Sequence, residues 1–135
     1  PEGYEFSHAA CGFDGNWSAV QTVTITNDEY TNSYYVEIFM YDLNRPIIYV
    51  SYLDMNDGNN TVSSQQLGIL RGTTVDLTDT TQLAELSFNV PNGYSISHAS
   101  CAFYNEWANT TSVVIPTGED AKQYWLFIYV YSNGD

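Results

Sequence analysis

The sequence predicts an all-β protein whose fold is an antiparallel β-sandwich with an internal pseudo-repeat. Three observations predict this fold class. Short segments alternate apolar and polar residues with the period of two that is typical of half-buried strands. Clusters of Gly, Asn and Asp separate these segments at short intervals. The same sequence unit also occurs at both ends of the 135-residue chain.

The repeated unit is found by sliding the chain over itself. Residues 1–45 and 91–135 align without a gap at an offset of 90 and are identical at 15 of 45 positions. The identities run from Pro1 and Pro91 to Tyr41 and Tyr131, which chance does not explain. We therefore expect one β-sandwich domain over residues 1–135, in which repeat units 1–45 and 91–135 flank a distinct middle, residues 46–90.

The first repeat unit contains three predicted strands. Residues 4–13 alternate until Gly12 and a turn at 14–16, and residues 17–26 alternate with many β-branched side chains before an acidic turn. Residues 34–41 form the third strand, and both of its faces are mostly apolar. One face carries Tyr34, Val36, Ile38 and Met40, and the other carries Tyr35, Glu37, Phe39 and Tyr41.

The middle predicts four more strands, at residues 47–53, 61–70, 73–77 and 83–90. An acidic loop separates the first two strands, and residues 78–82 form a polar loop with weak helical potential. The second repeat unit then repeats the three strands of the first. About ten short strands without a convincing helix favour an immunoglobulin-like or jelly-roll topology.

The last predicted strand, residues 124–131, has an aliphatic face and an aromatic face. A strand of an antiparallel sandwich normally has one wet face, so the aromatic face is expected to need a cover. A second sheet, a neighbouring subunit or a sugar would provide one, and plain core packing is the simplest interpretation. The candidate assembly or sugar-stacking residues are Tyr35, Phe39, Tyr41, Trp125, Phe127, Tyr129 and Tyr131.

The charge balance excludes two classes of partner. Three Lys and Arg against 16 Asp and Glu give a formal net charge of -13, which repels nucleic-acid phosphates and anionic lipid. No apolar run is long enough to insert into a membrane. The abundance of Asn, Ser and Thr favours an extracellular protein, and Asn16, Asn59 and Asn109 are glycosylation acceptors.

Cys11 and Cys101 occupy equivalent positions of the two repeat units. In an oxidising compartment they are candidates for an intrachain disulfide, while bridges to neighbouring molecules and two buried thiols stay open as alternatives. His8 and His98 each lie three residues before a cysteine. Residues three apart on a strand point to opposite faces, which argues against a zinc site.

The acidic loop supplies the one metal candidate, a calcium site at Asp54, Asn56 and Asp57. Its spacing departs from that of the helix-loop-helix calcium loop, so a hairpin turn is the simpler interpretation. No cofactor is expected otherwise. No nucleophile elbow, phosphate-binding glycine loop or glycosidase carboxylate pair stands out, so we expect no enzyme and no catalytic residue.

In its strand arrangement, the chain resembles the polymerising subunits of extracellular filaments that are built by strand exchange. It also resembles the immunoglobulin-type repeats of large surface proteins. The resemblance implies self-assembly with copies of itself into a filament, pilus-like fibril or surface array, a glycan coat and no catalysis. The apolar strand 124–131 at the end of the chain is expected to complete the sheet of a neighbour.

Two alternatives stay open. The first is a carbohydrate-binding module whose aromatic face stacks on sugar rings, which the 12 Tyr and three Trp of the chain favour. The second is that the chain is a window on a longer array with a period of 90 residues. In that case the order of repeat unit and middle continues beyond the residues given.

Overall fold

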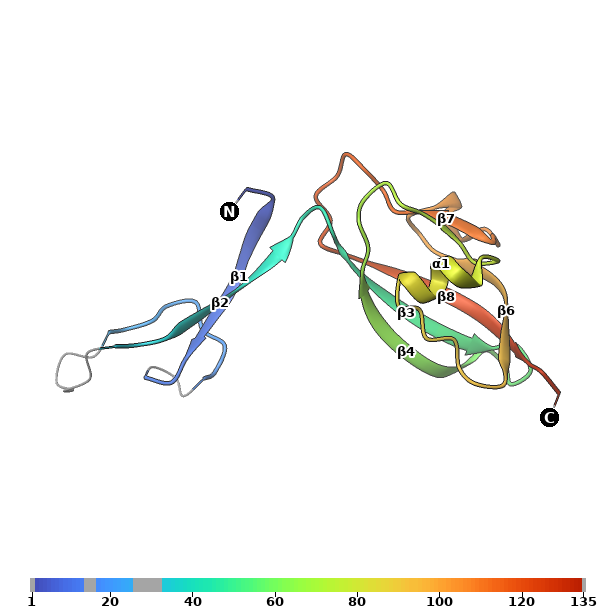
Figure 1. The fold of residues 1–135 in the computed structure, drawn as a ribbon, viewed down its shortest axis with the longest axis horizontal. Coiled ribbons are helices and arrows are strands. Elements are labelled where there is room, and N and C mark those ends of the chain that lie inside the picture. Colours follow the sequence, from blue (N-terminus) through green and yellow to red (C-terminus); the bar gives the residue numbers. More distant parts are fainter. Residues whose placement is uncertain (1, 14–16, 26–32, 135) are drawn as a thin grey trace. The chain divides into compact units, whose positions relative to one another are not determined.

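The computed structural model describes residues 2–13, 17–25 and 33–134, which form mostly β-structure in several open sheets (Figure 1). The chain divides into two compact units, unit 1 (Pro1–Leu43) and unit 2 (Asn44–Asp135). Where the sequence predicts one domain, the structure therefore has two units. The boundary lies near the end of the first repeat unit, because the middle folds with the second repeat unit.

Unit 2 is built on a four-stranded sheet with the order β4-β3-β8-β6. Antiparallel pairs join β3 (Ile47–Asp54) to β4 (Asn60–Gly68) and β6 (Tyr94–Ser100) to β8 (Gln123–Ser132). The central pair departs from the predicted antiparallel sandwich, since β3 and β8 run parallel. A parallel pair needs a crossover of a dozen or more residues, and the long segment between these strands provides it.

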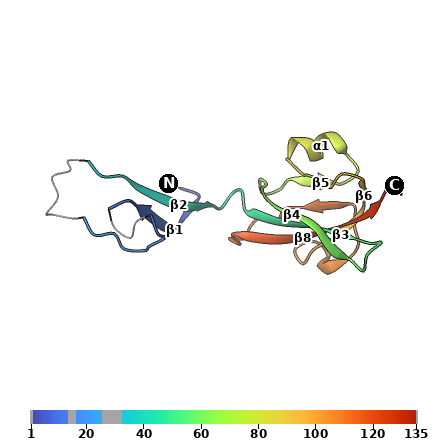
Figure 2. The ribbon, with the colours of Figure 1, turned by 90° about the horizontal axis from the view of Figure 1, so that it is seen from below.

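A second layer covers one face of this sheet. It consists of the antiparallel pair β5 (Thr74–Asp76) and β7 (Ser112–Val114) and the helix α1 (Thr80–Glu85), and Figure 2 shows α1 and β5 over the sheet. The core lies between the layers because the strands alternate as the sequence predicts. Its fully buried members include Ile48, Val50, Val75, Val113, Ile115, Leu126, Ile128 and Val130.

The predicted strand 83–90 is wrong, because α1 and an irregular segment replace it. The Asp79 side chain caps the helix by accepting a hydrogen bond from the Gln82 backbone N–H at 3.1 Å. The Gln82 side chain then ties the helix to β5 through hydrogen bonds with the Thr74 carbonyl and the Asp76 N–H. These polar contacts outweigh the strand-like alternation of Leu86, Phe88 and Val90.

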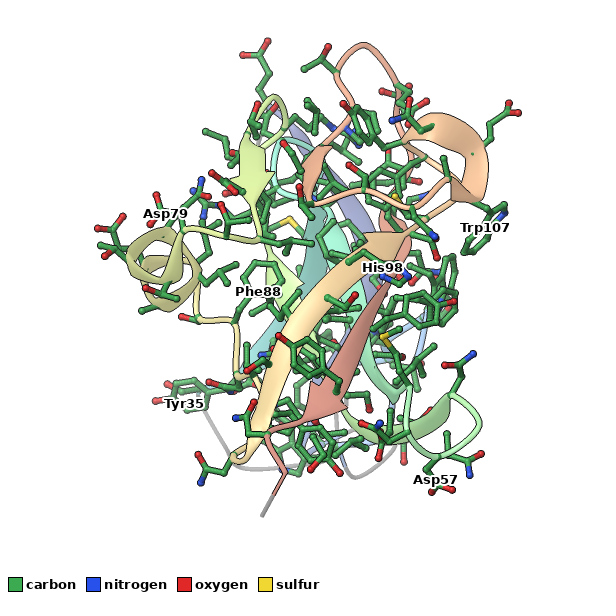
Figure 3. All side chains as sticks on the ribbon, turned by 90° about the vertical axis from the view of Figure 1, so that its right-hand side faces the viewer. Tyr35, Asp57, Asp79, Phe88, His98 and Trp107 are labelled. Carbon is green, nitrogen blue, oxygen red and sulfur yellow. The ribbon has the colours of Figure 1, made fainter. Side chains whose placement is uncertain are left out.

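The interpretation of residues 124–131 as a strand that completes a neighbour's sheet is also wrong. β8 lies inside the sheet, between β3 and β6, so both of its edges are already paired. Its aliphatic face is core and its aromatic face points to the other side of the sheet. Figure 3 shows the same division, with Asp79 and Phe88 on the helix side and Trp107 on the opposite side.

The described residues of unit 1 form one antiparallel pair, β1 (Tyr4–Cys11) and β2 (Val36–Asp42). The predicted strand 17–26 is wrong over its described residues, where Val20 makes only an isolated bridge to Ala9. The equivalent segment of unit 2 makes a similar bridge between Ala99 and Thr110 before β7. In unit 2 that segment pairs with β5, which belongs to the middle.

Candidate functional site

Unit 1 exposes a group of apolar side chains on the face of β2 that corresponds to the core face of β8. Ile38 is 55% exposed, whereas its repeat partner Ile128 is fully buried. Ile25 is 60% exposed, whereas Ile115 is fully buried. We call this surface the open apolar face, and its residues are Phe6, Val36, Ile38 and Met40, all exposed.

The correspondence between the two faces rests on identical strand geometry. In unit 1 the bulge interrupts the pairing between Phe6 and His8, and in unit 2 it lies between Ile96 and His98. Ile38 faces Ala9 across the strands, as Ile128 faces Ala99. The open apolar face is therefore built like a core face rather than like a solvated surface.

The contacts on the other side of the sheet repeat as well. In each unit a serine hydroxyl lies 2.9 Å from the Nδ1 atom of the next histidine, at Ser7–His8 and at Ser97–His98. Each imidazole stacks on an aromatic ring of the neighbouring strand with ring centroids 4.7 Å apart. These rings belong to Phe39 in unit 1 and Tyr129 in unit 2. The histidines therefore fix the strand pair and point away from the core side.

The middle contributes many of the residues that bury the core face of β8. Ile48, Val50 and Tyr52 of β3 continue this face beside β8 in the same sheet, and Val75 of β5 packs in the same cluster from the second layer. Among the described residues of unit 1, β2 has one strand partner, β1. In unit 2 the edge of β8 that is remote from β6 is paired with β3. The equivalent edge and face of β2 form the first candidate functional surface.

Unit 2 carries a second candidate surface on the side of the sheet away from the core. Tyr49 stacks on Trp125 with ring centroids 5.5 Å apart, and Trp107 stacks on Phe127 at 5.6 Å. Trp107 and Trp125 remain 52% and 51% exposed. A hollow of about 400 Å³ is lined mainly by their rings with Phe103 and Phe127. We call Tyr49, His98, Trp107, Trp125, Phe127 and Tyr129 the aromatic row.

A strained turn holds Trp107 in this row. The short 3-10 helix η1 (Asn105–Trp107) has three consecutive non-glycine residues with positive φ, at 55°, 43° and 72°. Each left-handed residue costs roughly 1–2 kcal/mol. The Trp107 N–H donates to the Cys101 carbonyl at 2.8 Å, and Trp17 of unit 1 repeats this bond to Cys11 with a φ of 70°. Strain of this kind tends to persist at positions with a role beyond packing.

Two buried tyrosines organise the polar contacts of unit 2. The Tyr124 hydroxyl donates to the Glu119 carboxylate and accepts from the Arg71 guanidinium at 3.0 Å. Arg71 also donates to the carbonyls of Pro116 and Ala121. Burial raises the pKa of Tyr124, and hydrogen bonding to Glu119 adds to this rise. Burial likewise raises the pKa of Tyr52, whose hydroxyl donates to the Gln65 side chain.

The structure distributes the predicted aromatic residues over two separate units. Tyr35 is exposed in unit 1, Phe39 stacks on His8, and Tyr41 is half-buried. In unit 2, Trp125, Phe127 and Tyr129 belong to one row, and Tyr131 follows them as an exposed residue. The sequence does not predict that Tyr49 and Trp107 belong to this row. Their contacts with it depend on the β3–β8 register and on the η1 turn.

Cys11 and Cys101 are present as thiols, each buried in its own unit. Burial raises the pKa of the Cys101 thiol, whose Sγ lies 3.7 Å from the Tyr104 carbonyl. The disulfide between the two residues stays a prediction. Asn59 and Asn109 are exposed, which leaves them accessible for glycosylation, and Asn16 lies outside the described residues.

The side-chain oxygen atoms of Asp54 and Asn56 in the acidic loop accept hydrogen bonds from other groups of the protein. Asp54 accepts from the Asn56 N–H at 2.8 Å and from the Tyr94 hydroxyl at 3.2 Å. The Asn56 side chain accepts from the Ser132 N–H at 2.8 Å. These contacts match the hairpin-turn interpretation. Within residues 2–13, 17–25 and 33–134, no three His, Cys, Asp or Glu side chains gather in a way that could hold a metal ion.

None of the helices in the described part of the chain combines the length and the apolar character needed to span a bilayer. Comparison with protein-family models, with curated proteins and with solved structures gives no match to this chain.

Proposed function

We propose that the chain is a non-catalytic, extracellular structural module that assembles with copies of its own repeat into a filament or surface array. The observation that carries this proposal is the open apolar face. Ile38 and Met40 are exposed at positions where unit 2 has fully buried Ile128 and Val130. An exposed core-type face on a strand with one strand partner among the described residues of unit 1 promotes association, so a specific partner for it is the economical explanation.

The chemistry of the rest of the surface supports an assembly role outside the cell. The net charge of -13 keeps such a module soluble and disfavours nucleic acid and anionic membranes as partners. Exposed Asn59 and Asn109, together with Asn16, are acceptors for a glycan coat. The intact mass of material purified from its source tests the coat, because each occupied site adds a discrete glycan mass.

Sedimentation velocity over a range of concentrations tests the assembly role. We expect the 135-residue chain to associate as its concentration rises, and Ile38→Asp to reduce this association because it places a charge on the open apolar face. Tyr35→Asp is the matched control, since Tyr35 is exposed on the opposite face of the same segment. A chain that stays monomeric, or two variants that associate equally, would contradict the proposal.

The aromatic row favours a second candidate function, the binding of carbohydrate. Exposed rings along one sheet face, with a hollow beside them, suit the apolar faces of sugar rings. Retention on insoluble cellulose or chitin tests this function. Trp125→Ala is expected to weaken retention about three- to tenfold. The matched control Tyr35→Ala removes an exposed ring in unit 1, and equal retention of the two variants would exclude the row as the binding surface.

A further inference from the structure

The internal repeat identifies what covers the open apolar face. In unit 2 the middle, residues 46–90, both extends and covers the equivalent face. Ile48, Val50 and Tyr52 of β3 continue this face beside β8, and Val75, Leu83 and Phe88 of the second layer pack in the same buried cluster. The strand pair β1–β2 matches β6–β8 in register, down to the position of its bulge. A surface with the same geometry and the same apolar character accepts the same kind of cover.

We infer that the open apolar face is an acceptor site for a further segment of the same pattern as the middle, supplied by an adjacent repeat of a longer array. This inference rests on the proposed function, because it names the partner in the assembly. The segment adds one strand parallel to β2 and places its counterpart of β5 and α1 over the face. Assembly is then the completion of each repeat unit by a middle that precedes it in the array.

The β3–β8 pairing gives the register of the added strand. Val50 lies opposite Leu126, and Tyr52 lies opposite Ile128. Transferred by the 90-residue offset, the counterpart of Val50 lies opposite Val36 and the counterpart of Tyr52 lies opposite Ile38. The parallel orientation follows from the same pairing. This register buries the aliphatic side chains of β2 and leaves Phe39 on the outer side with His8.

The middle of this chain does not fill the site itself. It already covers β8, and only four residues, 43–46, separate the end of β2 from the start of β3. A parallel pair requires a connection of a dozen or more residues, so β3 cannot fold back onto β2 in that orientation. A second copy of residues 1–135 can contact this face but has no spare middle to complete it, because it holds one middle for two repeat units. The occupant is therefore an additional middle.

The test extends the full 135-residue chain with an added copy of residues 46–90 ahead of residue 1. We expect hydrogen exchange of the β2 amides to slow by at least tenfold relative to the unextended chain, and a second cooperative unfolding transition to appear. Ile38→Asp in the extended protein should remove this transition and leave that of unit 2 unchanged. Val50→Asp in the added copy alone should do the same, whereas Tyr35→Asp should leave both transitions in place.

The outcomes separate this inference from the proposed function. Unprotected β2 amides in the extended protein would overturn the inference, even if the unextended chain associates through Ile38. Protection that survives both Ile38→Asp and Val50→Asp would also overturn it, because the added segment would then dock elsewhere. A monomeric unextended chain would contradict self-association alone, and protection of β2 by the added segment would still support the inference.

Discussion

Replacing Ile128 and Ile38 by alanine, one at a time, compares the same side chain in the same strand geometry with and without a cover. Ile128 is fully buried and Ile38 is 55% exposed. The substitution removes three carbon atoms, worth about 2.4 kcal/mol of transfer free energy at full burial. The cavity left in the core raises the expected loss for Ile128→Ala to about 3–4 kcal/mol. Ile38→Ala should change the unfolding free energy of unit 2 by less than about 0.5 kcal/mol.

Urea denaturation at low protein concentration measures this difference, with far-UV circular dichroism and tryptophan emission as probes. The midpoint of the unit 2 transition should fall strongly for Ile128→Ala and stay constant for Ile38→Ala, with the slope unchanged in both. Equal losses in the two variants would refute the reasoning, because Ile38 would then contribute to the core whose unfolding the transition measures. A loss below about 1 kcal/mol for Ile128→Ala would refute the assignment of β8 to the core.

Three further substitutions test the contacts of unit 2. Asp79→Ala should lower its unfolding free energy by about 1 kcal/mol in urea titrations because α1 loses its N-cap, and Asp79→Ser should restore most of it. Arg71→Met should cost about 2 kcal/mol in the same assay, because two carbonyls and Tyr124 lose a charged donor. The raised pKa values of Tyr52 and Tyr124 mean that the folded state favours their protonated hydroxyls. Their contribution to the unfolding free energy should therefore be fully present below pH 10 and decrease above it. Tyr52→Phe should make this decrease less steep.

A second substitution at the same residue, or the unchanged protein, serves as the control for each of these variants. An Asp79→Ser protein as unstable as Asp79→Ala would contradict the capping role. Arg71→Lys keeps the charge but not the forked geometry, so it should recover only part of the loss. An alkaline decline that is as steep in Tyr52→Phe as in the unchanged protein would contradict the contribution of the buried hydroxyl of Tyr52.

The strands could be predicted from the sequence wherever one face is buried, because burial enforces a period of two. β3 and β8 follow their predicted alternation, with Ile48 and Val50 or Leu126 and Ile128 in the core. The 90-residue repeat also predicted that β1 and β2 resemble β6 and β8. The order of the strands in the sheet could not be predicted, because alternation identifies the two faces of a strand but not its neighbours. The parallel β3–β8 pair depends on a crossover that leaves no local signal.

The helix and the site illustrate two other limits. Asp79 followed three residues later by Gln82 is a capping signal, and it was available in the sequence, but the alternation of Leu86, Phe88 and Val90 favoured a strand. The open apolar face could not be predicted because Ile38 and Ile128 are the same residue at equivalent positions of strands with the same apolar alternation. Only the absence of a cover in the described part of unit 1 distinguishes them, and that is a property of the tertiary structure.

The parallel pairing of β3 and β8 has a mechanical consequence. These are the first and last strands of unit 2, they are neighbours, and their aligned register runs from Ile47 and Gln123 to Asp54 and Val130. Tension applied between the start of β3 and the end of β8 pulls the two strands along their length in opposite directions. The backbone hydrogen bonds between them are then loaded in shear and must yield together instead of opening one after another. A tether built from such modules would resist stretching at the point where force enters each one.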